Sequence, residues 1–173
     1  MKKLYVILAL VALLALLATP TLATEGGTFM ATLTGFEEVP AISTTGSGEF
    51  RAKVTSDGTA IEYELSYSGL QNAFAAHIHL GQAGVNGGVF VFLCGGGGKP
   101  ACPASAGTVT GTITAVDIIG PVSQGIAAGE FNELVAAMKA GATYANVHTN
   151  DNVAPPNTGP GDFPGGEIRG QIE

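Results

Sequence analysis

The sequence predicts an all-β fold, an antiparallel sandwich or barrel with one short helix. Several short segments alternate apolar and polar residues, as strands with one buried face do. Gly, Pro, Asn and Asp gather between most of these segments, where turns are expected. One segment departs from this pattern and repeats its apolar residues at helical spacing.

Eight strands are expected, and the segment 61–68 is the clearest of them. Its apolar residues Ile61, Tyr63, Leu65 and Tyr67 alternate with glutamates and serines. The preceding segment alternates in the same way, and a Ser-Asp-Gly turn joins the two as a hairpin. In chain order, the expected strands cover residues 28–33, 50–55, 61–68, 75–80, 89–93, 108–115, 143–148 and 167–172.

The helix is expected around residues 131–138. Phe131, Leu134 and Met138 recur at helical spacing, and Gly141 stands where a C-terminal cap is needed. We expect this helix to cover one end or edge of the sheets.

The first 23 residues have the pattern of a secretory signal peptide. Lys2 and Lys3 precede an apolar run over residues 4–17, and small residues lead up to a cleavage position after Ala23. An uncleaved membrane anchor is the alternative, although the run is short for a spanning helix. We therefore expect a secreted or periplasmic protein without membrane attachment after cleavage, and one domain over residues 24–173.

The charge of the chain excludes one class of partner. The formal net charge is −7, and removing Lys2 and Lys3 with the signal peptide makes it −9. Such an acidic surface repels phosphate backbones and anionic lipid headgroups. We expect no nucleic-acid partner.

The two cysteines, Cys94 and Cys102, enclose a glycine-rich segment. In an exported chain the natural interpretation is a disulfide that closes this loop, rather than a pair of free thiols or metal ligands.

The three histidines lie in two short motifs and are the candidate metal ligands. His77 and His79 share one face of an expected strand, about 6.6 Å apart at a rise of about 3.3 Å per residue. If the fold brings His148 beside them, the three nitrogens form a set that zinc and copper favour. A structural polar cluster without metal is the open alternative.

Several charged residues are expected to surround this site or to pair near it. Glu167, Asp151 and Asp162 are candidates to accept hydrogen bonds from the outer ring nitrogens of metal-bound histidines. Arg169 is expected to pair with a strand carboxylate such as Glu62 or Glu64. The Glu37–Glu38 pair is interpreted as solvated charges of a strand face or a turn rather than as paired catalytic carboxylates.

Four motifs follow one another along the chain: LTGFEEVP at 33–40, AHIHLG at 76–81, ATYANVHT at 142–149 and GEIRGQI at 166–172. Their succession resembles the CHRD domain, a module named after chordin. The resemblance spans residues 28–173 and implies an all-β, immunoglobulin-like or barrel-like domain outside the cytoplasm. It implies no agreed biochemical activity.

A weaker resemblance is to copper/zinc superoxide dismutases, which also place His-x-His on a strand of a β-barrel. Those enzymes need more histidines than the three in this chain, so a two-metal site of that type cannot form.

Three functional hypotheses follow. The first is an exported, non-catalytic module that binds a protein or matrix component. The alternative is a protein that binds one copper or zinc ion through the three histidines, and the third hypothesis is an enzyme that uses such an ion. No nucleophile or acid–base constellation is recognisable in the sequence, which favours a non-catalytic role.

Overall fold

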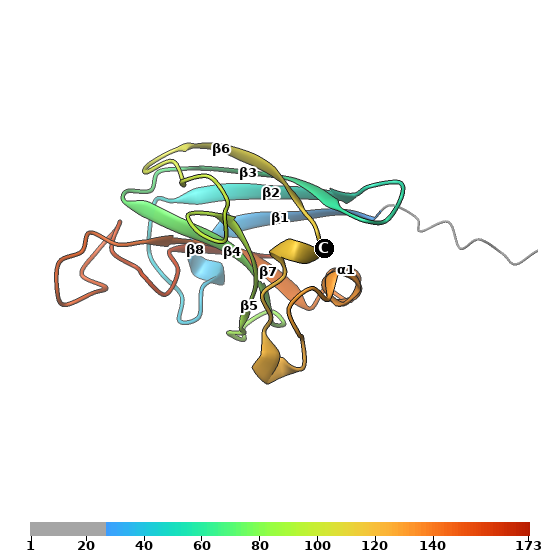
Figure 1. Ribbon diagram of the computed structural model, residues 1–173. Helices are drawn as coiled ribbons and strands as arrows, with labels where there is room; N and C mark the ends of the chain where they lie inside the picture. The colour runs from blue at the N-terminus through green and yellow to red at the C-terminus, as the bar shows by residue number, and fades with distance from the viewer. Residues whose placement is uncertain (1–26) are drawn as a thin grey trace, which may run out of the picture.

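The computed structural model describes residues 27–173 and forms one eight-stranded antiparallel sheet. The sheet curls into a nearly closed barrel, with an α-helix at one end (Figure 1). The expected all-β class is confirmed, in its barrel form. The predicted signal peptide, residues 1–23, lies outside the described residues.

Each expected strand forms, as does the expected helix. The strands are β1 (Thr28–Thr34), β2 (Ser47–Val54), β3 (Ile61–Ser68), β4 (Ala73–Leu80), β5 (Val89–Cys94), β6 (Gly107–Ile113), β7 (Thr143–Thr149) and β8 (Ile168–Gln171). The helices are the 3-10 helices η1 (Gly35–Glu37), η2 (Ala115–Asp117) and η3 (Val122–Gln124), and the α-helix α1 (Phe131–Lys139). The alternation did not indicate the 3-10 helices, which lie in loops.

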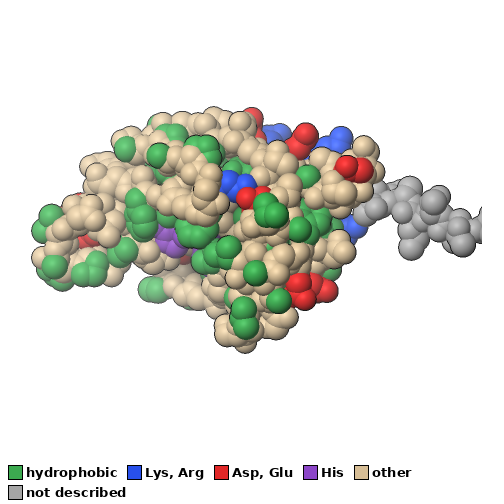
Figure 2. Space-filling view, in the orientation of Figure 1, with side chains coloured by type: hydrophobic (Ala, Val, Ile, Leu, Met, Phe, Trp, Pro, Cys, Tyr) green, Lys and Arg blue, Asp and Glu red, His purple; other side chains and the backbone are tan. Residues whose placement is uncertain are grey.

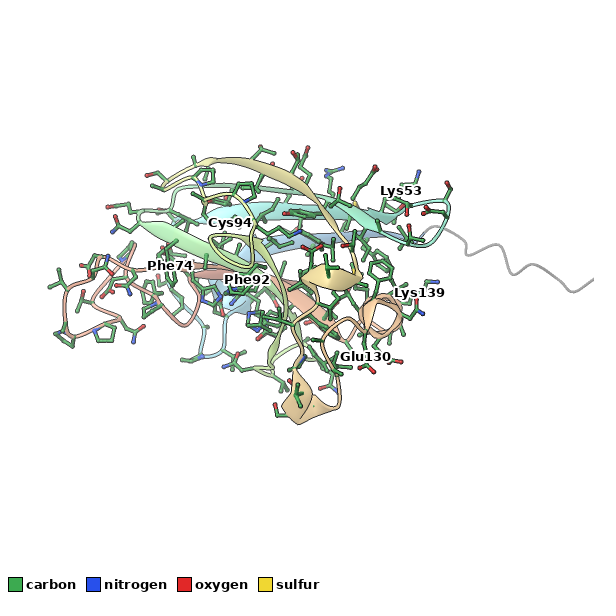
Figure 3. The ribbon with its side chains drawn as sticks, viewed as in Figure 1. Lys53, Phe74, Phe92, Cys94, Glu130 and Lys139 are labelled. Carbon is green, nitrogen blue, oxygen red and sulfur yellow. A yellow bond between two sulfur atoms is a disulfide. The ribbon has the colours of Figure 1, made fainter. Side chains whose placement is uncertain are left out.

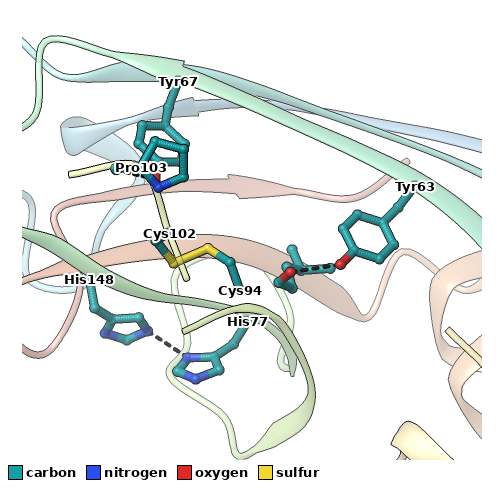
Figure 4. Close-up of a disulfide and its surroundings, with 8 residues drawn as sticks. Tyr63, Tyr67, His77, Cys94, Cys102, Pro103 and His148 are labelled. Atoms are coloured by element: carbon teal, nitrogen blue, oxygen red, sulfur yellow. Dashed lines mark hydrogen bonds between the residues drawn. A yellow bond between two sulfur atoms is a disulfide. The ribbon is translucent and has the colours of Figure 1, made fainter. Parts of the chain in front are cut away.

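The strand order is β5-β4-β7-β8-β1-β2-β3-β6, so β5 and β6 are the two edges. Side chains join these edges where the backbones do not pair. The Tyr63 hydroxyl on β3 donates a 2.6 Å hydrogen bond to the Leu93 carbonyl on β5 (Figure 4). The Lys99 ammonium donates to the Thr112 carbonyl on β6 and pairs with Asp117 at 2.8 Å. These contacts protect edges that would otherwise be free to pair with other strands.

The two halves of the barrel differ in what covers them. On β1, β2 and β3 the inward residues are buried and the outward residues are mostly exposed, as alternation predicts. All seven residues of β7 are buried, and so are most of those on β4 and β8. Ile78, Val147 and Ile168 supply the apolar inner face of this second half. Its outer face is polar and is covered by loops.

The α-helix packs as its sequence pattern predicts. Phe131, Leu134, Val135 and Met138 are its buried residues, and all four belong to the hydrophobic core. Gly141 follows the helix with a φ of 62°, the left-handed conformation that ends helices. Among residues 27–173, no helix has both the length and the apolar character needed to cross a bilayer.

The predicted disulfide between Cys94 and Cys102 is confirmed (Figure 4). It joins the end of β5 to the segment before β6. Gly96 and Gly97 in the loop that it closes lie against Phe92, and a side chain at Gly96 would collide with the ring.

Removal of the disulfide by Cys94→Ser with Cys102→Ser should lower the free energy of unfolding by about 2–3 kcal/mol, the chain-entropy value for a loop of this length. Urea unfolding followed by circular dichroism measures the change. Equal stability of the parent and the double variant would contradict the assigned role of the bridge.

Candidate metal centre

The fold brings the three histidines together on the polar outer face of the sheet. β7 pairs with β4, with Ala75 opposite His148 and His77 opposite Asn146. Because side chains alternate along strands, His77, His79 and His148 project from the same face. One nitrogen of each ring lies within 4.8 Å of the others. The proximity that the metal hypothesis requires is therefore present.

The cluster lies just beneath the surface. The three side chains are 7–8% exposed. Figure 2 shows histidine atoms reaching the surface between hydrophobic side chains. Irregular pairing with β5 flanks both His77 and His79, and such irregularities often re-aim side chains at functional sites.

Hydrogen bonds settle which ring nitrogens carry protons. His148 Nδ1 lies 3.0 Å from the Pro164 carbonyl, and His79 Nδ1 lies 2.9 Å from the Gly87 carbonyl. A carbonyl only accepts, so both Nδ1 atoms are protonated and both Nε2 atoms carry lone pairs. His148 Nε2 in turn accepts from His77 Nδ1 at 2.9 Å (Figure 4). The Nε2 atoms of His77 and His79 have no hydrogen-bond partner within the described chain.

Aromatic rings fix the orientation of the imidazoles. The Phe92 ring meets His77 edge-on with centroids 4.3 Å apart. Tyr144 stacks on His79 at 4.8 Å with an interplanar angle of 4°. The centroid of the Phe74 ring lies 6.1 Å from that of His148. Phe74 and Phe92 are labelled in Figure 3. Rings held in this way are preorganised for ligand binding.

Burial keeps the rings neutral. Burial, with smaller contributions from the neighbouring imidazoles, lowers the pKa of His77 to about 3. Burial likewise lowers the pKa of His148 to about 4, and it also lowers that of His79. All three rings are therefore neutral at pH 7. Three neutral nitrogen donors in one buried cluster suit zinc or copper.

The carboxylates expected beside the histidines make other contacts. Glu167 is fully buried and accepts hydrogen bonds from Thr44, Thr149 and the Gly161 backbone. Asp162 accepts from Thr158. These contacts hold the 150–167 loop, which carries the Pro164 carbonyl.

The third carboxylate, Asp151, is exposed and accepts from the Val153 backbone. The hydrogen-bond acceptors for the outer ring nitrogens of His79 and His148 are thus the backbone carbonyls of Gly87 and Pro164, and not the three acidic side chains.

The expected pairing of Arg169 with Glu62 or Glu64 is wrong. Arg169 is 1% exposed and donates to the carbonyls of Gln82 and Val85. Its guanidinium carbon also lies 3.4 Å from the Tyr144 ring centroid. The reason is the strand order. Arg169 lies opposite Asn146 on the loop-covered outer face of β8, whereas the two glutamates are exposed on β3, with β1 and β2 in between.

Sequence reasoning missed two residues of this layer. Asn146 is 2% exposed, and its position two residues before His148 could have placed it on the same face. Glu38 is 7% exposed, so its assignment as a solvated turn charge is wrong, while Glu37 is exposed as expected. Burial, opposed by the charge of Arg169, raises the pKa of Glu38 to about 7. No local signal distinguishes the two glutamates.

Comparison with known protein families matches residues 29–155 to the family described as CHRD domain. Neither the curated proteins nor the solved structures contain a significant match to the chain.

The metal-free protein should lose stability as the pH falls below about 6.5. Unfolded histidines take up protons at their ordinary pKa of about 6.5, whereas His77 and His148 stay neutral in the fold. The contribution of these two histidines to the free energy of unfolding is complete above pH 6.5. It is lost as the pH falls toward their pKa values in the folded protein, about 3 and about 4.

The raised pKa of Glu38 acts in the opposite sense, because that carboxyl binds its proton more tightly when folded. The informative measurement is therefore a difference, the unfolding free energy against pH for the parent and for His148→Gln in chelator. Below pH 6.5, the unfolding free energy of the variant should fall less steeply with decreasing pH than that of the parent. Identical slopes would contradict the neutral, buried state of His148.

Proposed function

The chain belongs to the CHRD-domain family. Because this family membership identifies the domain but no biochemical activity, we propose a function from the geometry of the site. The protein binds one copper or zinc ion through His77, His79 and His148. The observation that carries this proposal is the convergence of the only three histidines of the chain, all buried and neutral, in one cluster.

The chemistry of the donors supports metal binding over a purely structural cluster. A structural histidine normally uses both ring nitrogens in hydrogen bonds, since a buried polar atom without a partner costs about 1–3 kcal/mol. Within residues 27–173, His77 and His79 each leave Nε2 without a partner. Both ring nitrogens of His148 are hydrogen-bonded, so the ion takes its Nε2 lone pair in place of the bond from His77. The opposite nitrogen of His79 donates to a backbone carbonyl, as do the outer nitrogens of metal-bound histidines.

Export belongs to the same proposal. The disulfide supports an oxidising compartment, and the N-terminal pattern of Lys2, Lys3 and the apolar run over residues 4–17 supports secretion into it. Copper and zinc sites outside the cytoplasm avoid competition with the reducing thiol pool.

Non-catalytic binding of a protein or matrix component is the second candidate. Its support is a set of large apolar side chains that stay exposed in segments next to the polar layer. These are Phe36, Phe74, Val85 and Val153, which are 46–76% exposed. Exposed apolar side chains of this size are typical of interaction surfaces when they are contiguous. The two candidates are compatible in one protein.

Full-length protein without an affinity tag should bind one zinc or copper ion per chain. The double variant His77→Ala with His79→Ala should lose this binding, because one imidazole cannot hold the ion. Isothermal titration and elemental analysis after gel filtration give the stoichiometry.

The matched control is Glu62→Gln with Glu64→Gln, which removes surface charge far from the site and should bind as the parent does. A parent protein that stays metal-free, with a melting temperature indifferent to both ions, would overturn the proposal.

Expression in a secreting host should yield a mature chain that begins at Thr24. The intact mass of the exported protein shows where its N-terminus lies. A mass that includes residues 1–23 would show that the segment is retained as an anchor.

A further inference from the structure

Buried polar atoms without partners are concentrated around the histidines. In the described part of the chain, seven buried side-chain nitrogen or oxygen atoms have no hydrogen-bond partner. Four of them belong to one group of neighbours: His77 Nε2, His79 Nε2, Asn146 Oδ1 and Glu38 Oε1. Each such atom destabilises the fold unless something binds it. Their concentration at one place shows that the unsatisfied polar atoms of this cluster are not confined to histidines.

Asn146 is the member of this group that comes from the histidine strands themselves. It pairs with His77 in the register of β4 and β7, and it precedes His148 by two residues on β7. Its side chain therefore projects from the same face as all three imidazoles. It is 2% exposed, so solvent does not compensate its polar atoms.

The neighbours of Asn146 show how its amide is oriented. A side chain at Gly166 would collide with Glu38 Oε1 and would lie 2.8 Å from Asn146 Nδ2. The amide nitrogen and the carboxylate therefore share the space that the glycine leaves. Oδ1, at the opposite end of the amide, therefore points away from Glu38.

We propose that Asn146 Oδ1 is the fourth protein donor to the ion, so that the site is closed by three nitrogens and one oxygen. This inference rests on the proposed function. An amide oxygen is a hard donor, and with three imidazoles it selects a divalent ion, zinc(II) or copper(II), over copper(I). The Glu38 carboxyl lies beside the amide nitrogen, across the space that Gly166 leaves.

A closed site also bears on the role of the ion. Structural zinc sites use four protein donors, whereas catalytic sites keep one position open for water or substrate. Four buried donors hold an ion without exposing it to a substrate. The inference therefore assigns the protein to metal holding rather than metal catalysis.

The test compares Asn146→Ala and Asn146→Asp in the full, untagged chain, with zinc(II) affinity and the copper(II) electron paramagnetic resonance spectrum as readouts. Loss of the oxygen in Asn146→Ala should weaken zinc binding by about 10–100-fold and alter the copper hyperfine splitting. Asn146→Asp keeps an oxygen and adds a charge, so it should bind zinc about tenfold more tightly than the parent.

The matched control is Gln171→Ala. Gln171 is another amide of the sheet whose oxygen is buried without a partner among residues 27–173, but it lies on β8, beyond Tyr144 from His79. This variant should keep the affinity and the spectrum of the parent.

The outcomes separate the two claims. If Asn146→Ala leaves affinity and spectrum unchanged while His77→Ala with His79→Ala abolishes binding, the oxygen is not a ligand and the three-histidine proposal stands. If the parent binds neither ion, both fail. Should Asn146→Ala not fold, an unchanged spectrum and affinity in Asn146→Asp would overturn the fourth ligand.

Discussion

The structure depends on one constraint: β4, β7 and β8 are buried on both faces, and only one of those faces is apolar. The inner face packs into the barrel core through residues such as Ile78 and Val147. The outer face carries histidine, asparagine and arginine side chains, which must find hydrogen bonds where water is excluded. The loops over this half of the barrel supply hydrogen-bond acceptors for those groups.

Each covering loop contributes backbone carbonyls to the polar layer. The β4–β5 loop supplies Gly87 to His79, and it supplies Gln82 and Val85 to Arg169. The loop before β8 supplies Pro164 to His148. Figure 1 shows these loops on one side of the molecule, away from β6. The carbonyls of Gly87 and Pro164 take up the Nδ1 protons of His79 and His148. The Nε2 lone pair of His79 then has no partner among residues 27–173, and that of His148 accepts from His77.

Family membership and site geometry contribute different parts of the functional argument. The CHRD match identifies the domain and is consistent with the barrel, but no activity follows from it. The argument for chemistry comes from the arrangement of atoms: the proximity of the three imidazoles, their ring packing and the two unpartnered Nε2 atoms of His77 and His79 among residues 27–173. A function carried by a site on a common scaffold has to be argued in this way.

The sequence by itself determined the strands, the helix, the disulfide pair and the three histidines as the residues of interest. Periodicity and spacing are local properties. They therefore predict the strand from Ile61 to Tyr67 and the helix from Phe131 to Met138 without reference to the rest of the chain. Only the tertiary structure decided which polar residues surround the histidines. Glu38 and Glu37 are chemically identical neighbours, yet one is buried against Asn146 and the other is exposed. Arg169 likewise lies against Tyr144 rather than beside Glu62 or Glu64. Burial and partner choice depend on which loops cross a sheet face, and that is a long-range property which no local pattern records.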